Sequence, residues 1–139
     1  MKANVNWAGD MTFIGYGSSK HGVVMDGGEN AGGLGIGTSP MEMLMLGAGG
    51  CACIDVVMIL EKARQKITHV SVEVSGTRAD EHPRVFTDIH MNFLVKGRGL
   101  KESQVERAVD LSMTKYCSAS QTLARACKLT HEFIIEEDQ

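Results

Sequence analysis

The sequence has no run of Lys or Arg that could form a binding patch for nucleic acid or for an anionic membrane surface. It contains 14 Lys and Arg against 17 Asp and Glu, and its net charge of −3 gives no electrostatic reason to bind a polyanion. The amino terminus also lacks the apolar segment of a secretory signal. We therefore predict a soluble cytoplasmic chain with no nucleic-acid partner.

No apolar run is long and uninterrupted enough to predict a membrane-spanning helix. The longest extends from Met43 to Leu60, but it contains Asp55 and three glycines. A buried helix of a soluble protein fits this pattern better, so no membrane partner is expected.

Nucleotide-binding motifs are absent as well. Residues 27–38 (GGENAGGLGIGT) contain six glycines, but they match neither the dinucleotide fingerprint nor the P-loop with its Lys-Ser/Thr. We interpret the stretch as a mobile connector and predict no cofactor.

Four cysteines in a chain without an export signal are expected to be reduced thiols. Cys51 and Cys53 form a Cys-x-Cys pair, but two helical positions differ by about 200° of rotation, so the pair suits neither a shared metal nor a mutual disulfide. No other Cys or His falls at zinc-like spacing. We predict no metal site, and a core position for Cys53.

Cys117 differs from the other cysteines because a capping-box pattern, Ser118 to Gln121, follows it. A helix amino terminus there would favour the thiolate of Cys117. Cys127 falls late in the same helix and is expected to be a bystander. A plain core role for any single cysteine stays open, as does a Cys–His couple, for which no spacing selects among His21, His69, His82, His90 and His131.

The amino-terminal residues alternate between apolar and polar side chains. Ala3, Val5 and Trp7 share one face of residues 2–7, which predicts a half-buried strand. Turn residues separate it from two further strands, so the chain is expected to begin with an antiparallel meander over residues 2–7, 11–16 and 21–26.

The stretch from Ser39 to Gln65 predicts a central helix. Ser39 is the expected N-cap, Pro40 suits the first helical position, and Glu42 completes a capping box. The glycines inside it each cost about 1 kcal/mol relative to Ala, which indicates a very close contact with another helix or with a second copy of the chain. We therefore expect a dimer.

The remaining pattern predicts strands at 70–75 and 85–95, helices at 100–116 and 118–127, and a last strand at 129–135. This order is typical of an α+β fold with an antiparallel sheet. With no internal repeat, residues 1–139 are expected to form a single domain.

Three motifs resemble the OsmC/Ohr family: Ser39 to Glu42, Gly49 to Cys51, and Lys115 to Ser118. The resemblance extends over essentially the whole chain and is strongest for an OsmC-like subgroup. It implies an OsmC-like fold, in which antiparallel sheets surround two central helices in an intertwined homodimer.

The resemblance also implies an activity, the reduction of organic hydroperoxides. In the family, the cysteine that matches Cys51 attacks the peroxide, and the one that matches Cys117 resolves the sulfenic acid as a disulfide. A dithiol then reduces the pair, with lipoylated protein the favoured donor in Ohr-type members.

This chain departs from the Ohr-type pattern around the attacking thiol. There is no Arg before Arg64 to hold the thiolate, and Met41 stands where Ohr-type members have a Glu. Asp55, one turn after Cys51, would raise the thiol pKa unless a cation intervenes, and Lys20 is a conjectural replacement for the Arg. We therefore expect weak activity, with a hydrophobic-ligand-binding dimer or a cysteine-based redox sensor as alternatives.

Overall fold

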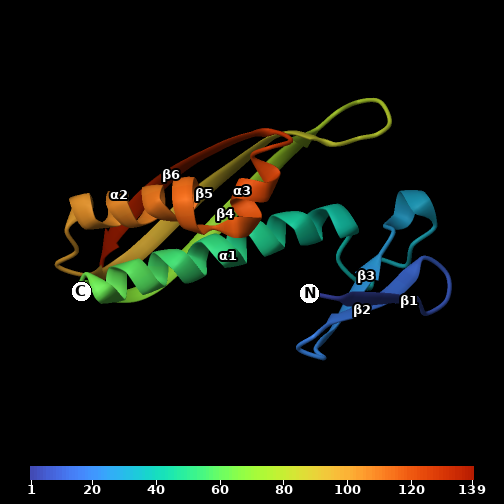
Figure 1. Cartoon of the computed structure of the whole chain (residues 1–139), viewed down its shortest axis with the longest axis horizontal. Helices are drawn as coiled ribbons and strands as arrows, with labels where there is room; N and C mark the ends of the chain where they lie inside the picture. Colours follow the sequence, from blue (N-terminus) through green and yellow to red (C-terminus); the bar gives the residue numbers. More distant parts are fainter. The chain divides into compact units, whose positions relative to one another are not determined.

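A computed structural model describes all residues from 1 to 139, which divide into two compact units, residues 1–44 and 45–139 (Figure 1). Helix α1 (Pro40–Lys62) begins in the first unit and continues through the second. The single domain expected from the sequence stays a prediction.

The first unit contains the expected antiparallel meander. Strands β1 (Ala3–Trp7), β2 (Thr12–Gly17) and β3 (Gly22–Asp26) pair in the order β1-β2-β3. The expected half-burial of β1 is wrong for the single chain, because every one of its residues is exposed. The alternation is present in the sequence, but within residues 1–44 no second layer covers the face that carries Val5 and Trp7.

The glycine-rich segment after β3 is ordered around one carboxylate. Asp26 is 1% exposed and accepts backbone N–H groups from Gly28 at 2.9 Å, Leu34 at 3.0 Å and Ile36 at 3.4 Å. A Cβ at Gly33 would lie 1.9 Å from an Asp26 carboxylate oxygen, so only glycine fits there. The segment also contains a short 3-10 turn, η1 (Glu29–Ala31), and we infer that its glycines serve close backbone approach to Asp26.

Replacing Asp26 with Asn is expected to loosen this segment, because an amide offers one acceptor oxygen where the carboxylate offers two. The bond from Gly28, followed by those from Leu34 and Ile36, holds the pKa of Asp26 below its ordinary value of 3.8. Since the folded pKa is depressed, the stabilisation is present above pH 3.8 and is lost as pH falls through the folded pKa.

Native-state amide exchange measures this effect, and the three amides bound to Asp26 should exchange at least about tenfold faster in Asp26→Asn. The wild-type chain should show the same local change under acid. Asp10→Asn, in the β1–β2 turn, is the matched control. Unchanged exchange in Asp26→Asn would contradict the role given to this carboxylate.

Helix α1 starts as the sequence predicts. Ser39 N–H donates to Glu42 Oε2 at 2.7 Å, and Glu42 N–H donates to Ser39 Oγ at 3.2 Å, which completes the capping box. Thr38 Oγ1 also contacts Glu42. Glu42 is therefore engaged in the cap of α1, and the Ser39 N–H holds its pKa below the ordinary value.

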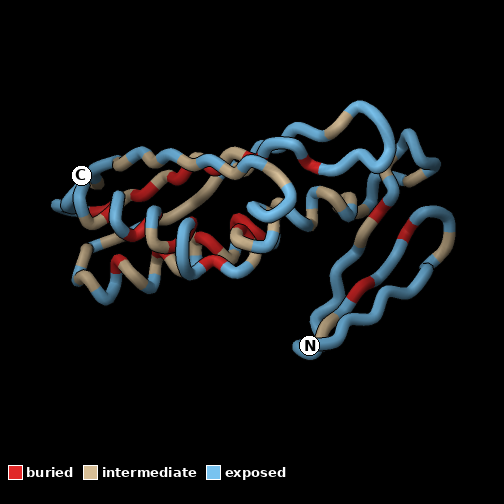
Figure 2. The backbone as a smooth tube through the Cα atoms, turned by 45° about the horizontal axis from the view of Figure 1, so that its top comes forward, coloured by how far each residue is buried: buried red, intermediate tan, exposed pale blue.

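The second unit is a three-stranded sheet with helices over one face (Figures 1 and 2). Strand β5 (Phe86–Arg98) is central, between β4 (Lys66–Arg78) and β6 (Lys128–Glu137). Alternate residues of β5 are buried, and they are Ile89, Met91, Phe93 and Val95.

The expected all-antiparallel sheet is wrong at one edge. Strand β4 pairs antiparallel with β5, but β6 pairs parallel with it. The reason is the connection, because the helical segment between β5 and β6 carries the chain back to the starting end of β5. That segment contains α2 (Glu102–Leu111), a π-helical turn η2 (Ser112–Tyr116) and α3 (Ser118–Leu123).

One side of α1 packs into this second unit. Its buried stripe consists of Ala48, Ala52, Val56 and Leu60, at the four-residue spacing of one helix face. A Cβ at Gly49 would meet Val74 and Val72 of β4 at 3.0 and 3.1 Å, so Gly49 serves the contact with the sheet rather than with a helix. Helix α1 is long and apolar enough to cross a membrane, with a mean hydropathy of 2.1 over an 18-residue window, and only one of its sides is buried in the single chain.

Candidate active site

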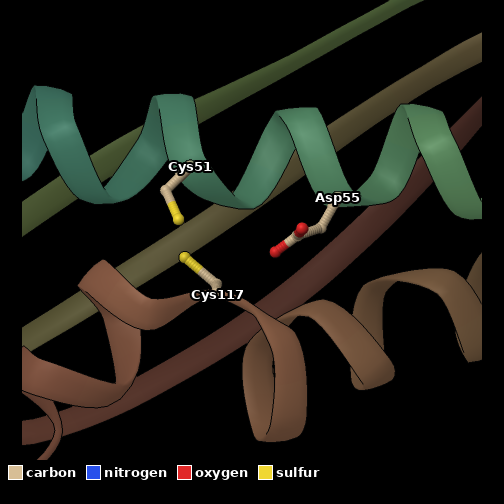
Figure 3. A group of neighbouring side chains, drawn as sticks. All are labelled: Cys51, Asp55 and Cys117. Carbon is tan, nitrogen blue, oxygen red and sulfur yellow. The ribbon is translucent and has the colours of Figure 1, made fainter.

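Two cysteines far apart in the sequence come together in the second unit (Figure 3). Cys51 lies on α1 with Asp55 one turn later, and Cys117 lies between η2 and α3. The two Sγ atoms and an Asp55 carboxylate oxygen all lie within 4.8 Å of one another. The structure therefore brings together the two residues that the sequence singled out, with a carboxylate beside them.

The turn before α3 fixes the position of Cys117. Cys117, rather than the expected Ser118, is the N-cap of α3, and its sulfur accepts the N–H of Ser120 at 3.4 Å. Its thiol also lies 3.0 Å from Ser120 Oγ and 3.7 Å from the Ala48 carbonyl oxygen. The side chain is fully buried, so these contacts hold the sulfur toward α1.

The sequence predicted a lowered pKa for the Cys117 thiol, and this prediction is wrong because the pKa is raised. Burial raises the pKa of Cys117, and the neighbouring Cys51 adds to this rise. The hydrogen bonds with the Ser120 side chain and backbone oppose the rise without reversing it. A helix amino terminus does favour a thiolate, but at this position desolvation outweighs it.

The other two cysteines lie outside the pair. Cys53 is two positions along α1 from Cys51, so it faces another direction, and burial raises its pKa. Cys127 donates to the Leu123 carbonyl oxygen at 3.4 Å, and its pKa is raised by burial and then by Asp88. All four thiols are free.

Ser112 is a neighbour that sequence reasoning missed. It is fully buried, and its Oγ donates to the Ala52 carbonyl oxygen at 3.1 Å and lies 3.4 Å from Asp55 Oδ2. No local pattern marks this residue, because its partners lie about 60 positions away on α1. Ser120 was detectable, since it stands three residues after Cys117 at the spacing of an N-cap contact.

No histidine joins the two cysteines. His90 contacts Thr130 and Glu132, and His131 contacts Asp110 at 2.9 Å. The group around the thiols contains only Cys51, Asp55 and Cys117. The structure therefore does not contain a Cys–His couple at these two thiols.

A cavity of about 340 Å³ opens beside Asp55. Its walls are mostly apolar, and two cationic side chains, Lys62 and Arg107, also line it. None of the ion pairs in the structure involves Asp55. The remaining lining residues are Met58, Ile59, Ala63, Leu111 and Tyr116.

Comparison with known proteins gives consistent matches. A family model described as OsmC-like protein matches residues 31–132. Protein YhfA of Escherichia coli K12 is 46% identical over 135 residues, with 96% of each chain covered. A solved structure described only as structural genomics is 41% identical, with a TM-score of 0.90 over 99% of this chain and 100% of the other.

A more distant structure has the same fold. It is an organic hydroperoxide resistance protein OsmC, predicted redox protein, regulator of sulfide bond formation, from Legionella pneumophila. It is 13% identical and superimposes with a TM-score of 0.72, covering 95% of this chain and 94% of that one. At this identity the match shows likeness of fold alone.

Proposed function

Because the chain belongs to the OsmC-like protein family, as its motifs predicted, we propose that it reduces organic hydroperoxides with Cys51 and Cys117. The family includes Ohr peroxidases, and the Legionella protein is named for hydroperoxide resistance. The observation that carries the proposal is the convergence of the two Sγ atoms from α1 and the N-cap of α3.

The chemistry proceeds in two steps. The Cys51 thiolate attacks the terminal peroxide oxygen, the O–O bond breaks, and the alkoxide leaves and takes a proton from water to become the alcohol, so that Cys51 becomes a sulfenic acid. The Cys117 thiol then attacks the Cys51 sulfur, water leaves, and a disulfide joins the two residues. An external dithiol restores both thiols and becomes a disulfide itself, and lipoylated protein is the reductant we favour.

Burial supports this order of events. Cys117 is fully buried and its pKa is raised, so it is mostly protonated at neutral pH and poorly accessible to a peroxide. Cys51 is only partly buried. The more accessible thiol attacks first, and the protected thiol resolves the product.

The activating groups of Ohr-type members are missing here. Met41 replaces the expected Glu, and Glu42 is engaged in the cap of α1. Lys20 lies in the β2–β3 turn of the other unit, and its role stays a conjecture. Asp55 places a carboxylate beside Cys51, so we expect slower turnover than in proteins whose thiolate is held by an Arg.

Members of the family are typically dimeric, and we propose a homodimer through the uncovered face of α1. Ile54 and Met58 are 62% and 48% exposed on this face, opposite the buried stripe. Gly47 and Gly50 lie on the same face, and a Cβ at either would meet nothing within 4 Å in the single chain. Small residues there permit the close approach of a second copy of α1.

A second candidate function is the binding of a small hydrophobic ligand. The apolar walls of the cavity beside Asp55 favour it, since ligand pockets are mostly apolar with a few polar groups. In that case the thiols would be dispensable. For both candidate functions we propose a cytoplasmic location, because free thiols persist in a reducing compartment.

Treatment with cumene hydroperoxide is expected to convert Cys51 and Cys117 into an intramolecular disulfide. Peptide mapping under non-reducing conditions measures it. Cys53 and Cys127, which lie outside the pair, should stay free and serve as internal controls. Two free thiols at Cys51 and Cys117 after this treatment would refute the proposed mechanism.

A further inference from the structure

We propose that Cys51, Asp55 and Cys117 form a binding site for Zn²⁺, in which the metal ion blocks the thiol pair. This proposal is argued from the geometry and the chemistry of the donor atoms, and it is independent of peroxidase activity. Two thiolates and a carboxylate are a ligand set suited to zinc, which accepts sulfur and oxygen donors in a tetrahedral arrangement.

The spacing of the donor atoms suits one ion. With Zn–S near 2.3 Å and Zn–O near 2.0 Å, tetrahedral donors stand about 3.5 to 3.8 Å apart. The three donor atoms here already lie within 4.8 Å of one another. A shift of at most about 1 Å in each separation, from 4.8 Å to 3.8 Å, would bring all three into range.

The scaffold presents these donors from two directions. Cys51 and Asp55 are four residues apart on α1, so their side chains lie on one face of the helix. Cys117 faces them from the N-cap of α3 (Figure 3). Cys53 is not among the donors, in agreement with the sequence, and the proposed ligands follow helix periodicity and tertiary contact rather than proximity in sequence.

The surroundings provide what a metal site needs beyond its ligands. Ser112 Oγ lies 3.1 Å from the Ala52 carbonyl oxygen and 3.4 Å from Asp55 Oδ2, so its single hydroxyl proton can turn to the carboxylate and orient it, as outer-shell groups do for ligating carboxylates. No ion pair in the structure compensates Asp55. A divalent cation would offset two of the three negative charges of the ligands, and we expect water from the cavity that Asp55 lines to supply a fourth ligand.

Bound zinc would change the redox behaviour of the pair. Both sulfurs would be held as metal-bound thiolates, so neither is free to attack a peroxide. Once zinc has dissociated, oxidation of the free pair by an organic hydroperoxide converts two thiols into a disulfide and yields an alcohol and water. Metal binding and disulfide formation are therefore mutually exclusive.

Zinc binding is tested on the reduced, metal-free full-length protein by competition with a chromogenic chelator. We expect one Zn²⁺ per chain, and Co²⁺ should give a near-ultraviolet thiolate charge-transfer band. Asp55→Asn should weaken zinc affinity at least about a hundredfold, since a ligand is lost. Asp55→His supplies a nitrogen donor and should retain tight binding, which separates loss of a ligand from loss of structure.

Two matched controls report on specificity. Glu61→Gln changes an exposed carboxylate on α1, and Cys53→Ser changes a thiol outside the group. Both should bind zinc as the wild type does, whereas protein oxidised to the Cys51–Cys117 disulfide should not. If Asp55→Asn bound Zn²⁺ as tightly as the wild type, or if Co²⁺ bound without a charge-transfer band, the proposed site would be wrong.

These binding measurements stand even if the protein consumes no hydroperoxide. Where it does, saturating Zn²⁺ should slow disulfide formation in the wild type, and a chelator should restore it. Rapid disulfide formation in the zinc-loaded wild type would overturn the blocking role while leaving the peroxidase proposal intact.

Discussion

Replacing Cys51 with Ser is expected to lower hydroperoxide reduction by on the order of a thousandfold or more, because a serine hydroxyl is a poor nucleophile without a base to activate it. Turnover is measured with cumene hydroperoxide and a reduced dithiol such as dihydrolipoamide. Cys53→Ser and Cys127→Ser remove thiols outside the pair and should leave the rate within about twofold of the wild type.

Cys117→Ser distinguishes the two roles. With the resolving thiol absent, the sulfenic acid should persist at Cys51, where dimedone traps it for peptide mapping. In Cys51→Ser no cysteine should be labelled at the same peroxide concentration. Labelling of Cys117 in that variant would reverse the proposed order of attack.

The Cys51→Ser variant also separates the two candidate functions. A hydrophobic-ligand-binding protein would retain its cellular phenotype and its ligand-induced stabilisation without this thiol. A variant that keeps the phenotype while losing all peroxide consumption would favour ligand binding. Wild-type turnover in Cys51→Ser would exclude the peroxidase mechanism.

Ile54→Glu is expected to convert the homodimer into a monomer. Ile54 is 62% exposed in the single chain, on the apolar face of α1 that we assign to the second copy. An unpaired carboxylate buried there costs several kcal/mol, which corresponds to at least about a hundredfold weaker dimerisation. Sedimentation at several protein concentrations measures the change.

Ile54→Val is the matched control, because it keeps an apolar side chain of similar shape and should preserve the dimer. Circular dichroism establishes whether the glutamate variant keeps its helical content. A dimer of unchanged stability in Ile54→Glu would exclude this face of α1 as the interface. A wild-type chain that is monomeric at all concentrations would exclude the homodimer itself.

Local patterns in the sequence predicted most of the secondary structure. The capping box placed the start of α1 correctly, since Ser39 and Glu42 satisfy each other's backbone groups without help from distant residues. Alternation likewise placed the strands of the meander and the main hairpin. The opposite facing of Cys51 and Cys53 follows from helix geometry alone.

Properties that depend on burial could not be read from local patterns. The pattern after Cys117 indicated a helix amino terminus and hence an acidic thiol, but the packing of α1 against η2 and α3 raises its pKa. The parallel pairing of β6 depends on how α2 and α3 return the chain across the sheet. The role of Asp26 depends on a loop that folds back over its carboxylate.

The sequence by itself determined the family and the α+β class and singled out Cys51 and Cys117, because caps, periodicity and motifs are local features that need no tertiary contacts. Only the tertiary structure decided which groups surround them. Asp55 and Ser112 stand beside the thiols because α1 lies against η2. Such contacts between distant segments fix how far each thiol is desolvated, how far apart the donor atoms lie and which charges surround them. These three properties determine the chemistry of the cysteine pair.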